Sequence, residues 1–471
     1  AFFIPYCLFL ALCGLPLFFM EVSYGQFSSL SPLAIWRICP LFKGVGIGMV
    51  MVSSIVCIYY NVIIAWTIYY LFMSFRATLP WSHCKNSWNS ENCIDTSERL
   101  AAEMAGGNST SLETNGHTVN VSTIVGNTTG AVVNAVYETV TGVAETAAKS
   151  NKSMSASEEF WERHVLQLSS GIDDMGELRW QLVITLALSW IFVFLCLFKG
   201  VKILGKGCHD LSSRDLSSSP SLASWLMRLA APSTRLLLRF GMFETMLSGL
   251  IDEFPHHLRN KKTLVTACTC LFEFLFGLPS ICQGGIYVLQ IMDWYCASFS
   301  LMLISLFECL AIAWIYGVDR FMKDIALMIG YEPHRIWIVM WKFVTPAAIL
   351  FIWLFSVITL GPVTYGDYNY PKWAIAMGWS IGVCSMLPIP LYAIFKIATE
   401  KGPIVQRVRK LLKPTEEWGP RNPEDRKRYL ASLGHADLET VETLTSKPSP
   451  IYKPSAPEQF NLISNPEKSD L

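Results

Sequence analysis

Seven uninterrupted apolar segments constrain the fold of this chain more than any other feature of its sequence. They lie at residues 1–23, 46–74, 179–198, 263–281, 285–316, 337–360 and 373–397. About 20 apolar residues suffice for a helix to cross the hydrocarbon core of a bilayer. The runs are continuous rather than alternating, and a lipid-exposed backbone satisfies its own hydrogen bonds within a helix, so strands are excluded. We therefore predict an all-α, polytopic membrane protein.

The composition supports lipid as the solvent and argues against several classes of function. The 471 residues are 52% hydrophobic and 16% charged, with a net charge of +0, which gives no global field for nucleic acid. The eight histidines show no metal-ligand spacing on any predicted span, and His256 and His257 fall in a basic loop. We predict that the chain is not an enzyme, binds no organic cofactor and binds no nucleic acid.

Charged loops predict the orientation of the chain. Lys and Arg gather after the first and third spans and before the fourth, as at Arg37, Lys199 and Arg259, which places these loops in the cytoplasm. The polar stretch 80–178 is then outside. It contains four glycosylation sequons, at Asn108, Asn120, Asn127 and Asn151.

The same outer loop contains two cysteines that lie outside the apolar runs, Cys84 and Cys93. Because the extracellular side is oxidising, a disulfide between them would persist. The alternative is a pair of free thiols in the loop.

Four ionisable residues within the spans are candidates for function, because charge inside a bilayer is costly. They are Glu21, Glu273, Asp293 and Glu308. For Glu21 and Glu308 a structural hydrogen bond to a neighbouring helix competes with substrate contact, and Glu273 has no visible partner in the sequence. Asp293 follows Gly284 and Gly285 and is expected to face an outer vestibule.

Polar residues in the middle of the second span form another candidate group. Tyr59, Tyr60 and Asn61 carry hydroxyl and amide groups that lipid cannot satisfy. Hydrogen bonding between buried helices is the alternative to a substrate site.

We predict different structures for two segments outside the apolar spans, 203–239 and 413–471. The segment 203–239 carries Leu222, Trp225, Leu226 and Leu229 at helical spacing, which favours a basic amphipathic helix on the inner leaflet. The tail 413–471 is rich in Pro, Lys, Glu and Ser, which predicts disorder, with Trp418 and Tyr429 as residues that pack on the inner face.

Several collinear motifs resemble the neurotransmitter:sodium symporter family, in its amino-acid branch. The run from Pro5-Tyr6 through Gly14-Leu15-Pro16 to Gly25-Gln26-Phe27 resembles the family's second helix, and Phe42-Lys43-Gly44 to Tyr59-Tyr60-Asn61 its third. Residues 177–202 look like the fourth helix, and 241–418 like the end of the eighth and helices nine to twelve.

The resemblance implies a division of the chain into six regions. These are helices two and three (1–79), an outer glycosylated loop with a disulfide (80–178), helix four (179–202), an unrelated cytoplasmic or interfacial segment (203–239), the end of helix eight with helices nine to twelve (240–400), and a cytoplasmic, largely disordered tail (401–471). The implied fold is a partial inverted-repeat sodium symporter with about seven of the parent's twelve helices.

The resemblance also implies site residues and a substrate class. Tyr60 matches a tyrosine that meets the substrate, Tyr6 a tyrosine of the chloride site, and Asp293 an outer-gate aspartate. Sodium and chloride are the implied coupling ions, and a small neutral amino acid the implied substrate. Thr364-Tyr365-Gly366 looks closest to glycine transporters, while Ser28-Ser29-Leu30 looks closer to proline carriers.

One departure from the family pattern puts transport by this chain in doubt. Where the family places an Asp and a Ser that help hold sodium, this chain has Leu237 and Leu238, and methyl groups cannot replace a hydration shell. The alternative hypothesis is a truncated isoform or gene-model fragment that acts at most as an oligomeric membrane partner of a full-length carrier. The family implies a plasma-membrane location, whereas the truncated form is expected to stay in the endoplasmic reticulum.

Overall fold

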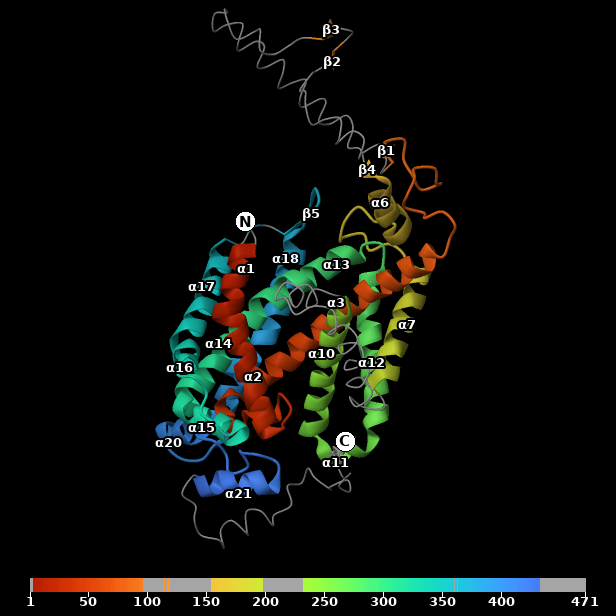
Figure 1. The fold of residues 1–471 in the computed structure, drawn as a ribbon. Helices are drawn as coiled ribbons and strands as arrows, with labels where there is room; N and C mark the ends of the chain where they lie inside the picture. The colour runs from red at the N-terminus through yellow and green to blue at the C-terminus, as the bar shows by residue number, and fades with distance from the viewer. Residues whose placement is uncertain are drawn as a thin grey trace, which may run out of the picture.

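The computed structural model describes residues 3–95, 113–114, 117–118, 154–197, 232–359, 361 and 363–432. These residues form a bundle of long helices with a small cap at one end, and the few strands are two residues long (Figure 1). The prediction of an all-α chain is therefore confirmed. The four sequons and the segment 203–231 lie outside the described residues.

Within the described residues, six helical stretches are long and apolar enough to cross a membrane, and a bent helix pair adds a seventh span. The stretches are Phe3–Ser28, Pro40–Ser74, Trp180–Leu197, Pro255–Ile281, Gly285–Ile329, Ile336–Ile358 and the pair Lys372–Met386 with Pro388–Thr399. Each overlaps one predicted span, and the chain is a multi-pass membrane protein.

The first part of the chain contains three of these spans and the cap. Its elements are α1 (Phe3–Phe9), η1 (Leu10–Gly14), α2 (Leu15–Ser28), η2 (Ala34–Ile38), η3 (Pro40–Phe42), α3 (Lys43–Ser74), β1 (Cys93–Ile94), β2 (Glu113–Thr114), β3 (His117–Thr118), β4 (Met154–Ser155), α6 (Ala156–Glu159), η6 (Phe160–Leu166) and α7 (Trp180–Leu197). Strands β1 and β4 pair in parallel, and β2 and β3 form an antiparallel hairpin.

The second part contains the remaining spans and the beginning of the tail. Its elements are α10 (Pro232–Glu253), α11 (Pro255–Leu258), η7 (Arg259–Lys261), α12 (Lys262–Gly277), η8 (Leu278–Ile281), α13 (Gly285–Met292), η9 (Asp293–Ser300), α14 (Leu301–Leu310), η10 (Ala311–Gly317), α15 (Val318–Ile329), α16 (Ile336–Val339), η11 (Met340–Val344), α17 (Thr345–Ile358), β5 (Thr364–Tyr365), β6 (Tyr368–Asn369), α18 (Lys372–Met386), α19 (Pro388–Thr399), α20 (Ile404–Leu411) and α21 (Pro423–Ser432). Helix α10 begins at Pro232, inside the segment 203–239, and Pro suits the first turn of a helix.

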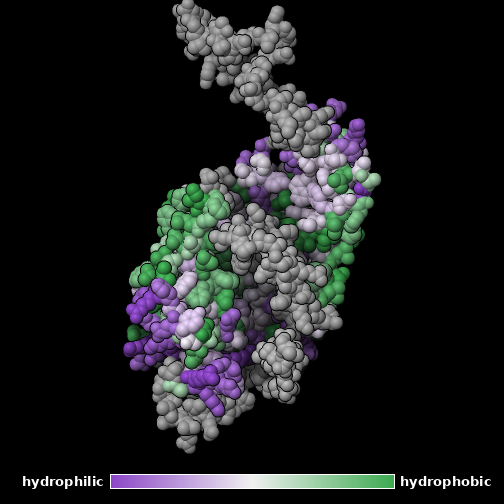
Figure 2. Space-filling view, in the orientation of Figure 1, coloured by the Kyte–Doolittle hydropathy of each residue, from purple (hydrophilic) through white to green (hydrophobic). Residues whose placement is uncertain are grey.

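The surface of the bundle divides into apolar and polar zones. Figure 2 shows hydrophobic side chains over the body of the bundle, and hydrophilic ones at the end near α15, α20 and α21 and around the cap at the other end. Large apolar side chains such as Phe18, Ile184, Leu271 and Phe355 are exposed on the body. A soluble protein would bury such residues, so this surface fits contact with lipid.

Helix α3 lies at the centre of the bundle and packs against α7, α10, α12, α19 and η9. Its glycines allow close approach of the bent pair α18–α19. A Cβ atom at Gly44 would lie 2.2 Å from the carbonyl oxygen of Pro388, and one at Gly48 would lie 2.8 Å from that of Ser385. Any side chain at Gly44 would therefore force α3 and the bend apart.

The beginning of the C-terminal tail is folded against the bundle. Trp418 and Tyr429 are buried, and both rings contact Phe27 at the end of α2. Trp418 Nε1 donates to the Tyr316 hydroxyl at 3.0 Å, and Arg320 donates to the Tyr429 hydroxyl at 3.0 Å. The prediction that these two aromatics pack is confirmed, but the predicted disorder does not hold as far as Ser432, because they anchor α21. Residues 433–471 lie outside the described residues.

Candidate functional site

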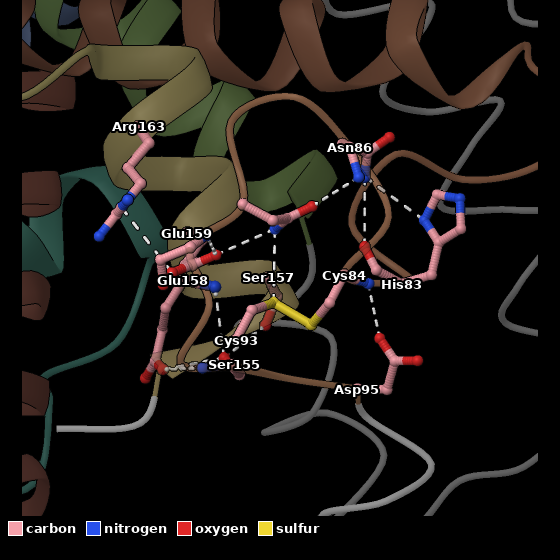
Figure 3. Close-up of a disulfide and its surroundings, with 12 residues drawn as sticks. His83, Cys84, Asn86, Cys93, Asp95, Ser155, Ser157, Glu158, Glu159 and Arg163 are labelled. Atoms are coloured by element: carbon pink, nitrogen blue, oxygen red, sulfur yellow. Dashed lines mark hydrogen bonds and ion pairs between the residues drawn. A yellow bond between two sulfur atoms is a disulfide. The ribbon is translucent and has the colours of Figure 1, made fainter. Parts of the chain in front are cut away.

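The outer cap is built around the predicted disulfide. Cys84 and Cys93 are bonded, with Cα atoms 5.8 Å apart (Figure 3). The pairing of β1 with β4 joins Cys93 to Met154, so the two ends of the long outer loop meet here. Ser155 begins α6 with a capping box, in which its side chain and that of Glu158 each bind the other's backbone N–H.

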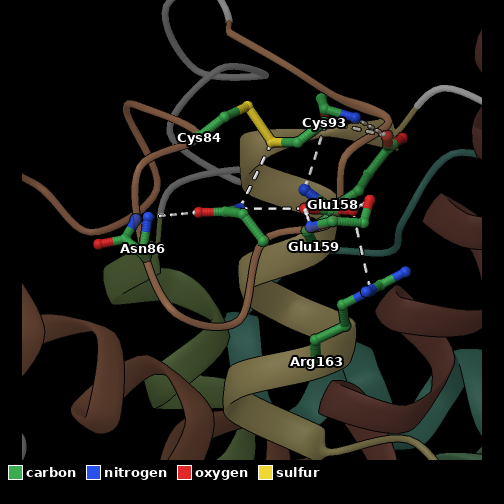
Figure 4. A network of polar contacts seen from close by, with 9 residues as sticks. Cys84, Asn86, Cys93, Glu158, Glu159 and Arg163 are labelled. Atoms are coloured by element: carbon green, nitrogen blue, oxygen red, sulfur yellow. Dashed lines mark hydrogen bonds and ion pairs between the residues drawn. A yellow bond between two sulfur atoms is a disulfide. The ribbon is translucent and has the colours of Figure 1, made fainter.

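Glu159 is the polar centre of this cap. The residue is fully buried, and its carboxylate accepts hydrogen bonds at 3.0 Å from Asn89 Nδ2 and from the Ser90 backbone N–H, and a third from the Ser90 hydroxyl. Arg163 lies 3.8 Å away (Figure 4). Burial alone would raise the pKa of Glu159, but the hydrogen bonds from Ser90 and Asn89 outweigh it and lower the pKa. This carboxylate is ionised and structural.

Aromatic contacts fix the cap on the bundle. Phe160, which is fully buried, lies 5.4 Å from Tyr70 of α3 and 5.3 Å from Trp81 between ring centroids. Arg179, just before α7, donates to the carbonyl oxygen of His164 at 2.8 Å. The position of the cap is therefore coupled to the positions of α3 and α7.

The candidate substrate site lies where α3 crosses η9, and it joins Tyr59, Tyr60 and Asp293. The Tyr59 side chain is buried, and its phenol interacts electrostatically with the Asp293 carboxylate. The Tyr60 ring lies 5.1 Å from that of Tyr59. Tyr60 is 37% exposed and Asp293 is also exposed, so the phenol and the carboxylate are both accessible, and Tyr59 interacts with each of them.

The backbone at Asp293 is π-helical, as it also is at η1, η6, η10 and η11. Asp293 begins the π-helix η9, which interrupts the regular helix formed by α13 and α14. Isolated π-helical turns occur frequently at functional sites. A carboxylate beside phenol groups can pair with a cation or an ammonium group, and a phenol O–H can donate to a carboxylate. The site therefore has the chemistry to hold a zwitterion.

Asn61 follows Tyr60 and is a further candidate. It is fully buried, and neither its amide nitrogen nor its oxygen has a hydrogen-bond partner among the described residues. Leaving such a group unsatisfied costs about 1–3 kcal/mol, so Asn61 has no structural reason to be polar in the described part of the bundle. The alternatives for Asn61 were a hydrogen bond between buried helices and a place in a substrate site. The described contacts contain no such hydrogen bond.

Tyr6, the predicted chloride residue, lies elsewhere. It is on α1 and is 44% exposed, at the end of the chain that runs beside α17 (Figure 1). The structure thus brings Tyr59 of α3 near Asp293 of η9, with Tyr60 beside Tyr59, and places Tyr6 on α1.

A buried carboxylate network joins α2 to α14. The Tyr24 hydroxyl donates to Glu308, and both residues are buried. Glu21 lies one turn before Tyr24 and interacts electrostatically with Glu308. The structural hydrogen bond expected for Glu308 is confirmed, whereas its second oxygen, Oε2, has no partner among the described residues.

Glu273 has a partner that the sequence did not reveal. It is fully buried in α12, and its carboxylate accepts a hydrogen bond of 2.5 Å from the Ser54 hydroxyl of α3. The two residues are 219 positions apart, so only the fold brings them together. One signal was available: Ser54 and Glu273 are both polar residues inside long apolar runs.

The described residues contain no group of three or more His, Cys, Asp or Glu side chains that could hold a metal ion. Positions 237 and 238, where the resemblance places sodium ligands, belong to the first turns of α10 and are leucines. The side chain of leucine offers no oxygen to a cation.

Comparison with known proteins identifies the family. The model of the sodium:neurotransmitter symporter family matches residues 1–209 and 222–400. The match thus extends into the segment 203–239 from both ends and leaves only 210–221 of that segment unmatched. The chain is 31% identical to the sodium- and chloride-dependent glycine transporter 2 of Xenopus laevis, over 93% of this chain and 70% of the relative.

Two further relatives have similar coverage. The chain is 31% identical to the sodium- and chloride-dependent glycine transporter 1 of Xenopus laevis, over 98% of this chain and 87% of the relative. It is 29% identical to the sodium- and chloride-dependent GABA transporter 2 of Rattus norvegicus, over 88% of this chain and 84% of the relative. The first alignment is 568 residues long, longer than the 471-residue chain, so it passes over stretches of the relative that have no counterpart here. From the apolar spans, the family match and these relatives together, the chain belongs to the sodium:neurotransmitter symporter family, whose members are transporters rather than enzymes.

Proposed function

We propose that this chain carries the substrate site of a sodium- and chloride-coupled symporter for a small neutral amino acid, with glycine as first choice and proline next. The observation that supports this most is that Tyr60 and Asp293 are both exposed and both interact with the buried Tyr59 of α3. Both groups can bind the charged ends of an amino acid. The glycine transporters among the relatives favour glycine, and the GABA transporter is the reason to test GABA as well.

In this proposal each residue has a separate role. The Tyr60 hydroxyl donates to the substrate carboxylate, while Asp293, oriented by Tyr59, closes the outer side. Tyr6 contributes to the chloride site. Sodium moving down its gradient drives uptake, and chloride compensates its charge.

The test is uptake of labelled glycine, proline and GABA into cells that express the chain at the plasma membrane. We expect glycine uptake that disappears when choline replaces sodium or gluconate replaces chloride. Tyr60→Phe should reduce uptake at least tenfold without changing surface expression, because only a hydroxyl is removed. Tyr331→Phe is the matched control, since Tyr331 is 69% exposed on a loop. Equal uptake in both variants would contradict the role of Tyr60.

We also propose a second candidate, in which the chain does not transport and instead associates with a full-length carrier. It is favoured by the leucines at 237 and 238 and by an alignment longer than the chain. In this case the chain alone gives no sodium-dependent uptake, remains in the endoplasmic reticulum, and co-purifies with a full-length glycine transporter whose uptake it lowers. Mature complex glycans on Asn108 or Asn151, together with uptake by the chain alone, would exclude this candidate.

A further inference from the structure

An apolar groove lies beside the bend between α18 and α19. Its volume is about 420 Å³, and every residue that lines it is apolar. The walls come from η3, α14 and both helices of the bent pair, and include Phe42, Leu303, Phe307, Met386, Leu387 and Pro390.

The bend that forms this groove is held in place by backbone contact. Helices α18 and α19 are inclined to one another by 42°, and the bend sits directly on Gly44 of α3. On the other side, Phe42 and Phe307 contact one another with ring centroids 6.4 Å apart. Both walls are therefore fixed by packing, so the groove keeps its shape.

The groove opens on the apolar surface of the bundle. Val383 and Leu387, on its lip, are 44% and 41% exposed, and both belong to the bent membrane span. A groove in this position is filled by hydrocarbon. An apolar lining alone gives no preference for one lipid, because lipid tails are as apolar as leucine. Selectivity must come from the polar residues next to the groove.

One end of the groove is basic. Lys396 lies one turn beyond Ala393 of the lining, on the same face of α19, and its Nζ lies 6.0 Å from the centre of the Tyr392 ring. Among the described residues Lys396 makes no ion pair. Its neighbour Glu400 is held by Lys410 at 2.6 Å, and Lys43, at the same ring, is held by Glu253 at 2.6 Å.

Helix α20 places this basic end at the surface of the membrane. Its exposed Ile404 and Val405 lie on a helix that also carries Arg407, Arg409 and Lys410, which is the pattern of a helix lying in the bilayer interface. Residues 396–413 contain six Lys or Arg and one acidic residue. A net positive charge at the headgroup level attracts anionic lipid.

We propose that the groove binds one acyl chain of a phospholipid with an anionic headgroup, whose phosphate lies at Lys396 and the basic residues of α20. The apolar walls hold the chain, and the charges select the headgroup. This site is independent of the proposed transport activity, since it lies at the bend of the last span rather than at the crossing of α3 and η9.

The test uses the full chain in nanodiscs of phosphatidylcholine with a minor share of phosphatidylserine. After purification in detergent, native mass spectrometry measures which lipids remain bound. We expect enrichment of phosphatidylserine, and Lys396→Gln should reduce this enrichment about fivefold. Lys323→Gln is the matched control, because Lys323 is an exposed lysine on α15 and should leave the enrichment unchanged.

A second variant tests the groove itself. Ala393→Phe fills the space and should remove bound phosphatidylserine while Lys396 is intact, and Leu303→Phe should do the same from the opposite wall if Ala393→Phe fails to fold. Equal enrichment in Lys396→Gln and Lys323→Gln would overturn the proposal. When cholesterol is added to the nanodiscs, its retention in place of phospholipid would also overturn the proposal. A change of oligomeric mass in Ala393→Phe would do so too, because it would make the groove an interface between copies of the chain.

Discussion

The cap and the membrane bundle bury carboxylates in different ways. In the cap, both oxygens of Glu159 accept hydrogen bonds, from donors on Asn89 and Ser90. In the bundle, Glu308 and Glu273 each have one oxygen bonded to a hydroxyl and one without a described partner. In the cap, the Glu159 carboxylate uses both oxygens in structural hydrogen bonds. In the bundle, one oxygen each of Glu308 and Glu273 is left without a described hydrogen bond inside a membrane protein, where an unsatisfied polar group is costly. This makes the two buried carboxylates of the bundle candidates for function.

The largest effect should come from removing the acceptor in the cap. Glu159→Leu leaves three donors without their acceptor, at a cost of about 3 kcal/mol or more to the local unfolding of α6 and η6. Hydrogen exchange of the amides in 154–166 measures this directly. Glu91→Leu serves as control, because Glu91 is exposed in the same cap. Unchanged protection in Glu159→Leu would mean that the network is incidental.

Loss of the disulfide should destabilise the cap slightly less than Glu159→Leu. Cys84 and Cys93 are nine residues apart, and a short loop loses little entropy on closure, so Cys84→Ser should destabilise the cap by about 2–3 kcal/mol. Limited proteolysis of 80–95 is the measurement. The double variant Cys84→Ser/Cys93→Ser should match the single one and be insensitive to reductant, whereas the native cap should become as sensitive as the variants when reduced.

A smaller effect is expected in the bundle. Tyr24→Phe removes the one hydrogen bond to Glu308 and should lower stability by about 1–2 kcal/mol, seen as a lower thermal midpoint in detergent than for Tyr331→Phe. If the pair interacts as described, Tyr24→Phe and Glu308→Gln together should cost less than the sum of the two. Additive losses would show that the contact carries no energy.

The smallest effect is a pH dependence confined to the cap. Burial, followed by the charges of Arg179 and Arg76, lowers the pKa of His164, and hydrogen bonds lower that of Glu159. In both cases the unfolded cap binds protons more readily than the folded one, so stability is lost as pH falls below each group's ordinary pKa. The loss should occur in two steps, first at the histidine and then at the glutamate.

The rate at which a phosphine reduces the Cys84–Cys93 disulfide, measured across this pH range, reports opening of the cap. Glu159→Gln should lack the more acidic step and retain the other. If the reduction rate stayed constant down to strongly acidic pH, the stability of the cap would not depend on the protonation of His164 or Glu159, which would contradict the prediction.

The fold was predictable from the sequence because lipid imposes a simple rule. A helix must be apolar for about 20 residues to span the bilayer, so all seven spans could be located before any contact was known. The disulfide was also predictable, since its two cysteines lie outside the apolar runs. Tyr60 and Asp293 stand out in the sequence as polar residues in apolar surroundings, and their role at the site stays a prediction.

The partners of the buried polar groups could not be predicted. Tyr24 meets Glu308 across 284 positions, and Ser54 meets Glu273 across 219. Periodicity within one helix shows which residues share a face, but not which other helix that face meets. Packing of Trp418 and Tyr429 was predicted, but their partner Phe27 on a distant helix was not, so the order of the tail as far as Ser432 was missed.

The length of α3 links the bundle that carries the candidate substrate site to the thickness of the membrane. With 32 residues, α3 is about 48 Å long, whereas the hydrocarbon core measures about 30 Å, and the helix crosses the bundle on a diagonal (Figure 1). A thicker bilayer favours a more upright helix at a cost of fractions of a kcal/mol per Å. Because α3 packs at the centre of the bundle, against η9 among others, such a change in tilt would move its neighbours with it, and the thickness of the bilayer would act on the whole bundle that carries Tyr60 and Asp293.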